Sequence, residues 1–128
     1  MPARGARAAA RASHRRLMNV GGGSGQFALF HAAKATIKKT AAHGIALVSM
    51  TNAWMSGRSA YYVEMIAKHR LVAIHTAASS RLVAPPGGIR PVLGTNPIAI
   101  AVPSSRGPIV VASENSIRVT RGQQRIRT

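Results

Sequence analysis

The sequence predicts an α/β fold, with α+β as the alternative, in one unit of modest size. The chain of 128 residues has room for a single domain with a limited hydrophobic core. Helical and strand-like hydrophobic patterns follow one another in the order helix, strand, helix, strand, loop, strand, strand. We therefore expect a partial mixed sheet with flanking helices.

Charge divides the chain into three parts. Eighteen Lys and Arg residues face two acids, Glu64 and Glu114, which gives a net charge of +16. Residues 1–20 carry five Arg and no acid, and residues 112–128 carry four Arg and one Glu. We expect a basic arm rich in Arg and Ala (1–20), a folded central unit (21–111) and a basic tail (112–128). This charge favours polyanion binding or indicates incomplete folding.

Composition leaves two interpretations open for the N-terminal arm: a basic helix, loosely similar to an organelle-targeting peptide, or a poorly ordered low-complexity segment. A glycine-rich loop follows at residues 21–26. A dinucleotide fingerprint needs a strand in front of such a loop, and none is predicted there. We therefore favour a flexible loop that leads into a helix with Ser24 near its N-cap over a phosphate-binding loop.

Residues 26–42 have the periodicity of a helix. Its predicted apolar stripe consists of residues at spacings of three and four: Phe27, Phe30, Ala33 or Lys34, Ile37 and Ala41. Gly44 is a plausible left-handed cap at its end. The short apolar run 45–50 then predicts a buried strand.

Residues 58–70 predict a second helix, and residues 71–75 a second buried strand. Four residues are expected to form the buried face of this helix: Tyr61, Tyr62, Met65 and Ile66. Glu64 and Lys68 have the spacing of a weak ion pair on one helix face. The strands 45–50 and 71–75 flank the helix as they would in a βαβ unit with a right-handed crossover.

The stretch 82–103 is rich in turn residues and feeds a short strand. Pro85-Pro86-Gly87-Gly88 bends the chain sharply, and Leu93-Gly94-Thr95-Asn96-Pro97 bends it again. Residues 98–102 predict a buried strand that Pro103 ends, and residues 108–111 predict the last strand. Rigid loops between strands are common sites for small molecules, although a plain connection fits the same pattern.

Residue types alone indicate little chemistry. The chain has no cysteine, so disulfides and thiolate catalysis are excluded. We find no paired carboxylates, no metal-binding histidine motif, no nucleophile elbow, no Walker loop and no aromatic platform for nucleic acid. The single Trp, Trp54, lies in a polar loop (51–57) after the first predicted strand, where ligands often bind in α/β proteins.

Several short motifs resemble the malate/L-lactate dehydrogenase family of NAD(P)-dependent, non-Rossmann oxidoreductases. They are Gly25-Gln26 before an Ala-rich helix, the run 43–48, Gly57 to Tyr62, and Gly87-Gly88 followed by Leu93-Gly94-Thr95-Asn96-Pro97. The last pair of motifs is the most specific. The resemblance covers residues 21–111.

The resemblance implies hydride transfer between NAD or NADP and a 2-hydroxy acid such as malate or lactate, or a 2-imino acid. It further implies an α/β fold and a homodimer. The absence of cysteine fits a reducing compartment, and no run of eighteen apolar residues could span a membrane, so we expect a cytoplasmic protein without membrane partners. Ser79 matches a position where family members contact the cofactor, and Thr95 and Asn96 fall in the loop beside cofactor and substrate. For Thr95 and Asn96, fixing the turn is an equally good interpretation.

Three departures leave the catalytic residues unassigned. Met55 stands where many family members carry a histidine that acts as acid and base, and its thioether moves no proton. Ala112 follows the last strand where the family has Asp. Ser13-His14 has the letters of a catalytic pair that some members use, but the following Gly is missing and the spacing is too short. His14 is therefore the weakest candidate.

The Arg-rich ends contrast with the central match, and this contrast favours a truncated or frame-shifted reading frame that keeps the centre of a dehydrogenase. We therefore expect a family oxidoreductase whose activity is in doubt. Two alternatives stay open: a basic protein that binds polyanions or nucleic acid through its ends, and a fragment without function.

Overall fold

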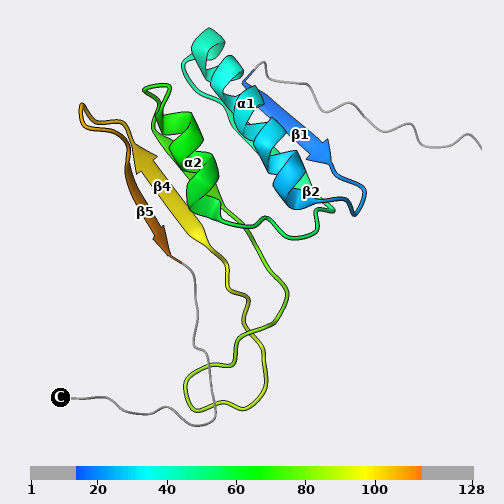
Figure 1. Ribbon diagram of the computed structural model, residues 1–128. Helices are drawn as coiled ribbons and strands as arrows, with labels where there is room; N and C mark the ends of the chain where they lie inside the picture. The colour runs from blue at the N-terminus through cyan, green and yellow to red at the C-terminus, as the bar shows by residue number, and fades with distance from the viewer. Residues whose placement is uncertain (1–13, 114–128) are drawn as a thin grey trace, which may run out of the picture.

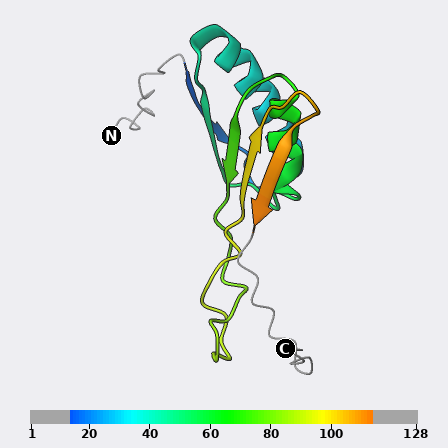
Figure 2. The same cartoon turned by 90° about the vertical axis from the view of Figure 1, so that its left-hand side faces the viewer.

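The computed structural model describes residues 14–113 and shows two small sheets connected by two packed helices (Figure 1). The elements along the chain are β1 (Arg15–Asn19), α1 (Gly25–His43), β2 (Leu47–Thr51), α2 (Ser59–Ala67), β3 (Ala73–Thr76), β4 (Ile98–Val102) and β5 (Ile109–Ser113). β1 and β2 pair in parallel, whereas β3, β4 and β5 form an antiparallel sheet. Helices combined with both kinds of pairing confirm the α/β class. A long loop between β3 and β4 projects from the body (Figure 2).

Both ends of α1 are capped as the sequence predicts. The Ser24 hydroxyl accepts a hydrogen bond from the Phe27 amide at 3.4 Å. Gly44 has a φ of 75°, and its amide donates to the Thr40 carbonyl at 2.8 Å. Glycine adopts this left-handed conformation without steric penalty, which is why the helix ends here.

The predicted apolar stripe of α1 is confirmed at Ala33, which is buried, and at Ile37, which packs against the core, but it is wrong at Phe27 and Ala41. The buried residues are Gly25, Ala28, Leu29, Ala32 and Ala33. Phe27 is 69% exposed instead, and its ring contacts His31 with 4.5 Å between centroids. Small side chains fill the buried face because α1 and α2 pack closely there, and a phenylalanine would hold the two helices apart.

The core lies between α2 and the antiparallel sheet. Val63 of α2 and two alanines of β4, Ala99 and Ala101, have 0% exposure. Alanine at both inward positions of β4 lets the helix lie close to the sheet. Tyr62 and Ile66 are buried as predicted, whereas Tyr61 is 47% exposed and lies outside the core.

β1 corrects two predictions about the N-terminal region. Part of the expected basic arm, Arg15–Asn19, is a strand, and its pairs run in register from Arg15–Leu47 to Asn19–Thr51. The glycine loop therefore does follow a strand, and the parallel βαβ unit of the fold is β1-α1-β2. The strand begins with two arginines and has no apolar pattern that would predict it from the sequence. Backbone pairing with β2 holds it in place. Residues 1–13 lie outside the described part.

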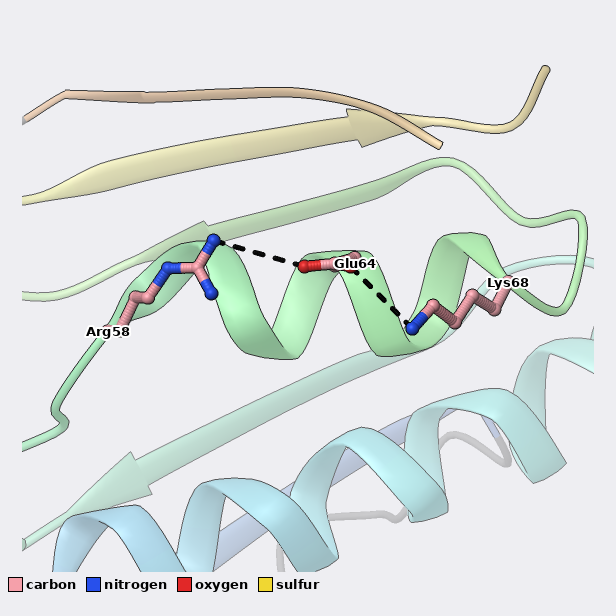
Figure 3. Close-up of polar contacts among 3 residues, drawn as sticks. All are labelled: Arg58, Glu64 and Lys68. Carbon is pink, nitrogen blue, oxygen red and sulfur yellow. Dashed lines mark ion pairs between the residues drawn. The ribbon is translucent and has the colours of Figure 1, made fainter. Parts of the chain in front are cut away.

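β2 and β3 flank α2 but do not pair with each other, contrary to the expected βαβ unit. Both strands run opposite to α2 and therefore in the same direction (Figure 3). A cavity of about 190 Å³ lies between them, closed on one side by α1 and α2. Its lining includes His75 of β3, whose ring centroid lies 5.9 Å from that of Tyr62.

The sheet face away from the helices carries exposed apolar side chains, because residues alternate between the two faces of a strand. Ile98 and Ile100 of β4 are 43% and 36% exposed, and Ile109 and Val111 of β5 are 61% and 65% exposed. The expected burial of 98–102 therefore holds for one face only. Within residues 14–113, neither helix has both the length and the apolar character that a membrane span requires.

We predict that His75 makes the folded state less stable in mild acid. Burial lowers the pKa of His75 below its ordinary value of 6.5, so the unfolded chain binds this proton more readily than the folded chain. The contribution of neutral His75 to the free energy of unfolding is fully present above about pH 6.5, and it is lost as the pH falls through the lowered pKa. Urea unfolding at about pH 7.5 and about pH 5 measures it.

The matched variants are His75→Phe, which keeps a ring against Tyr62, and His69→Phe at an exposed site beyond α2. We expect His75→Phe to lose part of the pH dependence and His69→Phe to retain it. Equal pH dependence in all three proteins would contradict the assignment to His75.

Candidate cofactor site

The loop 77–97 begins as a direct continuation of the β3–β4 ladder. Thr76 pairs with Ile98, and the Ala77 amide then donates to the Pro97 carbonyl at 3.1 Å. Each further step adds one residue on each side, so Ser79 falls opposite Thr95. The antiparallel register therefore fixes which side chains meet at the base of the loop.

Ser79, Thr95 and Asn96, the three predicted cofactor-binding residues, meet at this point. The Ser79 hydroxyl accepts from the Thr95 amide at 2.8 Å and lies 3.1 Å from the Thr95 hydroxyl. The Asn96 side-chain oxygen accepts from the Ser79 amide at 3.2 Å. We call Ser79, Thr95 and Asn96 the hydroxyl-amide cluster.

The hydroxyl-amide cluster keeps hydrogen-bonding capacity for a ligand. Ser79 and Asn96 are exposed, and Thr95 is partly exposed. Within residues 14–113, no hydrogen-bond partner occurs for the Asn96 side-chain NH₂ group, which offers two donors. When Ser79 donates to Thr95, the Thr95 hydroxyl proton is also free to donate. The cluster can therefore bind carbonyl, hydroxyl or phosphate oxygens.

Gly94 is required for the cluster to close. A Cβ at this position would lie 2.6 Å from the Ser79 carbonyl oxygen and 2.7 Å from both the Asn96 Oδ1 and the Ser79 Oγ atoms. No side chain fits at these distances. Asn96 has a φ of 39°, an uncommon conformation that asparagine tolerates better than most residues. Strained backbone of this kind is frequent at binding sites.

The outer part of the loop is held by its own turn. Val83 forms an antiparallel bridge with Leu93, two residues out of step with the Ser79–Thr95 pairing. At the tip, the Gly88 amide donates to the Pro85 carbonyl at 2.8 Å, and Gly87 has a φ of 76°. Pro at the second and Gly at the third turn position are typical of a type II β-turn.

The loop is cationic. It contains Arg81 and Arg90 and no acid, since the chain has no Asp or Glu between Glu64 and Glu114. Glu64 lies on α2, 3.9 Å from the Arg58 guanidinium and 3.6 Å from the Lys68 ammonium (Figure 3). Both pairs are largely exposed and contribute little to stability. An anionic group such as a pyrophosphate would meet only positive charge on the loop.

The four glycine amides of the loop between β1 and α1 are not free to form a phosphate cradle. They donate within the chain: Gly21 to the Asn19 side chain, Gly22 to the Asn52 carbonyl, Gly23 to the Val20 carbonyl and Gly25 to the Trp54 carbonyl. A Cβ at Gly25 would lie 2.6 Å from the Met55 carbonyl oxygen. Gly25 therefore serves close packing against the loop after β2, and the occupied glycine amides agree with the preference for a non-phosphate role.

The remaining candidates lie apart from the hydroxyl-amide cluster. Met55 is 63% exposed with a φ of 46°, in the loop that follows β2. That loop and loop 77–97 leave the sheets at the same edge, the carboxyl ends of β2 and β3 (Figure 1). His14 precedes β1 at the opposite edge, where its carbonyl accepts from the Leu47 amide at 2.8 Å. The structure does not bring His14 to the cluster.

Sequence reasoning missed Arg81 and Arg90 and the spacing role of Gly94. The signal for the arginines was available, because a stretch without acids that contains basic residues predicts an anion site. The role of Gly94 could not be predicted from the sequence, because its close contact with Ser79 depends on the register of β3 and β4. Neither described cavity is lined by residues of loop 77–97.

Comparison with known proteins decides the family. A sequence model described as malate/L-lactate dehydrogenase matches residues 7–122. The chain belongs to this family. The match extends beyond the central stretch 21–111 on both sides and confirms the resemblance that the Leu93–Pro97 motif indicated.

Relatives of this dehydrogenase-family chain are much longer than it is. Malate dehydrogenase of Pyrococcus abyssi is 37% identical over 95 residues, which are 74% of this chain and 26% of the relative. Malate/(S)-sulfolactate dehydrogenase of Methanothermus fervidus is 34% identical, over 77% of this chain and 29% of the relative. Ureidoglycolate dehydrogenase (NAD(+)) of Escherichia coli O157:H7 is 30% identical, over 73% and 27%. The chain spans about a quarter of the length of these relatives.

Solved structures give the same assignment. The structure of malate dehydrogenase from Pyrococcus horikoshii OT3 matches with a TM-score of 0.66 and 38% identity, over 73% of this chain and 27% of that chain. Sulfolactate dehydrogenase from Methanocaldococcus jannaschii matches with a TM-score of 0.72 and 28% identity, over 80% and 30%. The dehydrogenase fold is therefore shared over most of this chain.

We predict that Ser79→Ala loosens the base of the loop. It removes the acceptor of the Thr95 amide, a hydrogen bond worth about 1 kcal/mol. Hydrogen exchange at the Ser79 and Thr95 amides should become about fivefold faster. Ser80→Ala is the matched control, because within the described residues only the backbone of Ser80 takes part in a hydrogen bond. If the two variants have equal exchange rates at these amides, the Ser79 hydroxyl does not hold the base of the loop together.

Proposed function

We propose that this chain binds the nicotinamide cofactor of a family oxidoreductase that transfers hydride between NAD or NADP and a 2-hydroxy acid, or a 2-imino acid. The substrate is malate-like or lactate-like. The observation that carries this proposal is the convergence of Ser79, Thr95 and Asn96 on a loop that has two arginines and no acid. The names of the relatives, one of which includes NAD(+), support the same class of cofactor.

The residues of loop 77–97 have the chemistry to bind such a cofactor. Hydroxyl and amide donors suit its ribose and carboxamide oxygens, and Arg81 and Arg90 suit its pyrophosphate. The close approach at Gly94 leaves the cluster pre-formed, so the loop does not need to be ordered by the ligand.

The chain's own residues hold the cofactor in this proposal. The bound cofactor supplies or accepts the hydride. The Ser79 hydroxyl fixes the loop, the Thr95 hydroxyl and the Asn96 side-chain NH₂ group donate to the cofactor, and the arginines neutralise its charge. A proton must move when a hydroxyl becomes a carbonyl, and Met55 cannot take it. We therefore propose that this chain binds cofactor and turns over substrate slowly, as a cytoplasmic protein that associates with a second copy.

A second candidate function is polyanion binding. The basic ends, 1–20 and 112–128, hold nine of the eighteen Lys and Arg residues and one acid, Glu114. Such a composition favours binding to nucleic acid with a strong dependence on salt. On this account the ends carry the binding, and deletion of 1–13 and 114–128, which leaves β1 intact, should abolish most of it.

Calorimetric titration with NADH and NADPH tests the cofactor proposal. We expect saturable binding that Ser79→Ala weakens about fivefold, the loss of one hydrogen bond, and that Ser80→Ala leaves unchanged. Turnover with malate, lactate or a cyclic 2-imino acid should be slow or undetectable.

Inorganic tripolyphosphate is the matched probe for charge alone, because it has no nicotinamide or ribose. If tripolyphosphate binds as tightly as NADPH and Ser79→Ala changes neither, then polyanion binding explains the data and the cofactor proposal fails. If NADH, NADPH and tripolyphosphate all fail to bind, both proposed functions are wrong.

A further inference from the structure

Trp54, the single tryptophan of the chain, is held by its backbone while its side chain is exposed. The Trp54 amide donates to the Gly23 carbonyl at 2.9 Å, and the Trp54 carbonyl accepts from the Gly25 amide at 2.6 Å. With the parallel bridge between Ser24 and Trp54, these bonds continue the β1–β2 pairing beyond the ends of both strands. The residue is nevertheless 72% exposed. The indole is therefore fixed at its base without belonging to the core.

Close packing and unusual backbone angles fix the loop that carries Trp54. A Cβ at Gly25 would lie 2.9 Å from the Trp54 carbonyl oxygen, so the start of α1 lies directly against this loop. Asn52 and Met55, on either side of Trp54, have φ values of 53° and 46°. Side chains rarely adopt this left-handed conformation, and it is frequent at binding sites. The backbone therefore favours a loop shaped for binding over a plain connection.

The indole offers both a ring face and a hydrogen-bond donor. None of the ring contacts within residues 14–113 involves Trp54. Its Nε1–H group likewise has no acceptor in this part of the chain. Tryptophan is enriched at binding surfaces because one rigid ring supplies a large apolar area together with a donor. These properties fit a planar ligand that lies on the indole.

Trp54 and the hydroxyl-amide cluster belong to loops at the same edge of the molecule. The loop after β2 and loop 77–97 leave the sheets at the carboxyl ends of β2 and β3 (Figure 1). Within the described residues, no hydrogen bond or ring contact connects Trp54 to the cluster. A ligand that meets both must therefore extend from one loop to the other, as an elongated dinucleotide can.

Electrostatics at this edge favour an aromatic partner for a cationic ring. The only acid in residues 14–113 is Glu64, which lies 3.9 Å from the Arg58 guanidinium and 3.6 Å from the Lys68 ammonium. No carboxylate in these residues is therefore free to attract a positive charge. The face of a tryptophan ring attracts cations more strongly than that of any other side chain. The oxidised nicotinamide ring is such a cation, whereas the reduced ring is neutral.

We propose that Trp54 stacks on the nicotinamide ring and binds the oxidised cofactor more tightly than the reduced one. This inference rests on the proposed cofactor-binding function and adds a cofactor-binding residue from a second loop. The hydroxyl-amide cluster binds the ribose and carboxamide, and the indole covers one face of the ring.

Calorimetric titration of the full chain with NAD⁺, NADH and ADP-ribose tests this contact. ADP-ribose is the matched probe, because it lacks only the nicotinamide ring. We expect Trp54→Ala to weaken NAD⁺ binding about tenfold and NADH binding about threefold, since attraction to a positive charge is lost only for the oxidised ring. Binding of ADP-ribose should not change. Phe27→Ala, which removes another exposed ring, should change none of the three affinities.

The fluorescence of Trp54 gives a second readout that needs no variant. Because the chain has one tryptophan, the indole emission comes from this side chain alone. NAD⁺ should quench it, because the electron-poor ring lies against the indole, and ADP-ribose should leave it unchanged.

Three results would overturn the contact: unchanged emission with NAD⁺, equal weakening of NAD⁺ and ADP-ribose by Trp54→Ala, or equal weakening of NAD⁺ and NADH. The cofactor function would still stand in each case if Ser79→Ala weakens NADH binding about fivefold. If neither NAD⁺ nor NADH binds to the unaltered chain, both the contact and the cofactor function are wrong.

Discussion

The antiparallel register of β3 and β4 is the constraint on which the candidate site depends. Pairing of Thr76 with Ile98 leads, one residue at a time, to the meeting of Ser79 with Thr95. A shift of one residue would place Ser79 opposite a different side chain and would turn the alanines of β4 away from α2. Packing of the core therefore fixes the geometry of the loop, and Gly94 allows the last close contact. A rigid sheet thus positions the exposed loop that carries the candidate site.

The same small side chains that build the core leave other surfaces open. Ala99 and Ala101 bring α2 close to the sheet, but the opposite face of β4 exposes Ile98 and Ile100. The gap between β2 and β3 adds unpaired strand edges. Proteins usually cover such edges and faces, because both promote association. These open surfaces are consistent with a chain that spans about a quarter of the length of its relatives.

Local patterns predicted much of the fold and the identity of the site loop. Caps at Ser24 and Gly44, the strand 98–102 and the turn at Pro85–Gly88 all follow from short-range chemistry, and the structure confirms them. The position of β1, the buried face of α1 and the failure of β2 and β3 to pair depend on distant partners, so no local pattern contained them. For the hydroxyl-amide cluster, the family motif predicted Ser79, Thr95 and Asn96 as site residues, and the register of two strands explains why they meet.

NMR mapping of cofactor binding tests the central claim, that β3–β4 pairing builds a nicotinamide site from Ser79, Thr95 and Asn96. NADPH is titrated into ¹⁵N-labelled protein and the amide shifts are followed residue by residue. The account predicts that the largest changes fall in residues 77–81 and 93–97, with little change in the glycine loop 21–25. Changes centred on the glycine loop, or spread evenly over the basic residues, would contradict it.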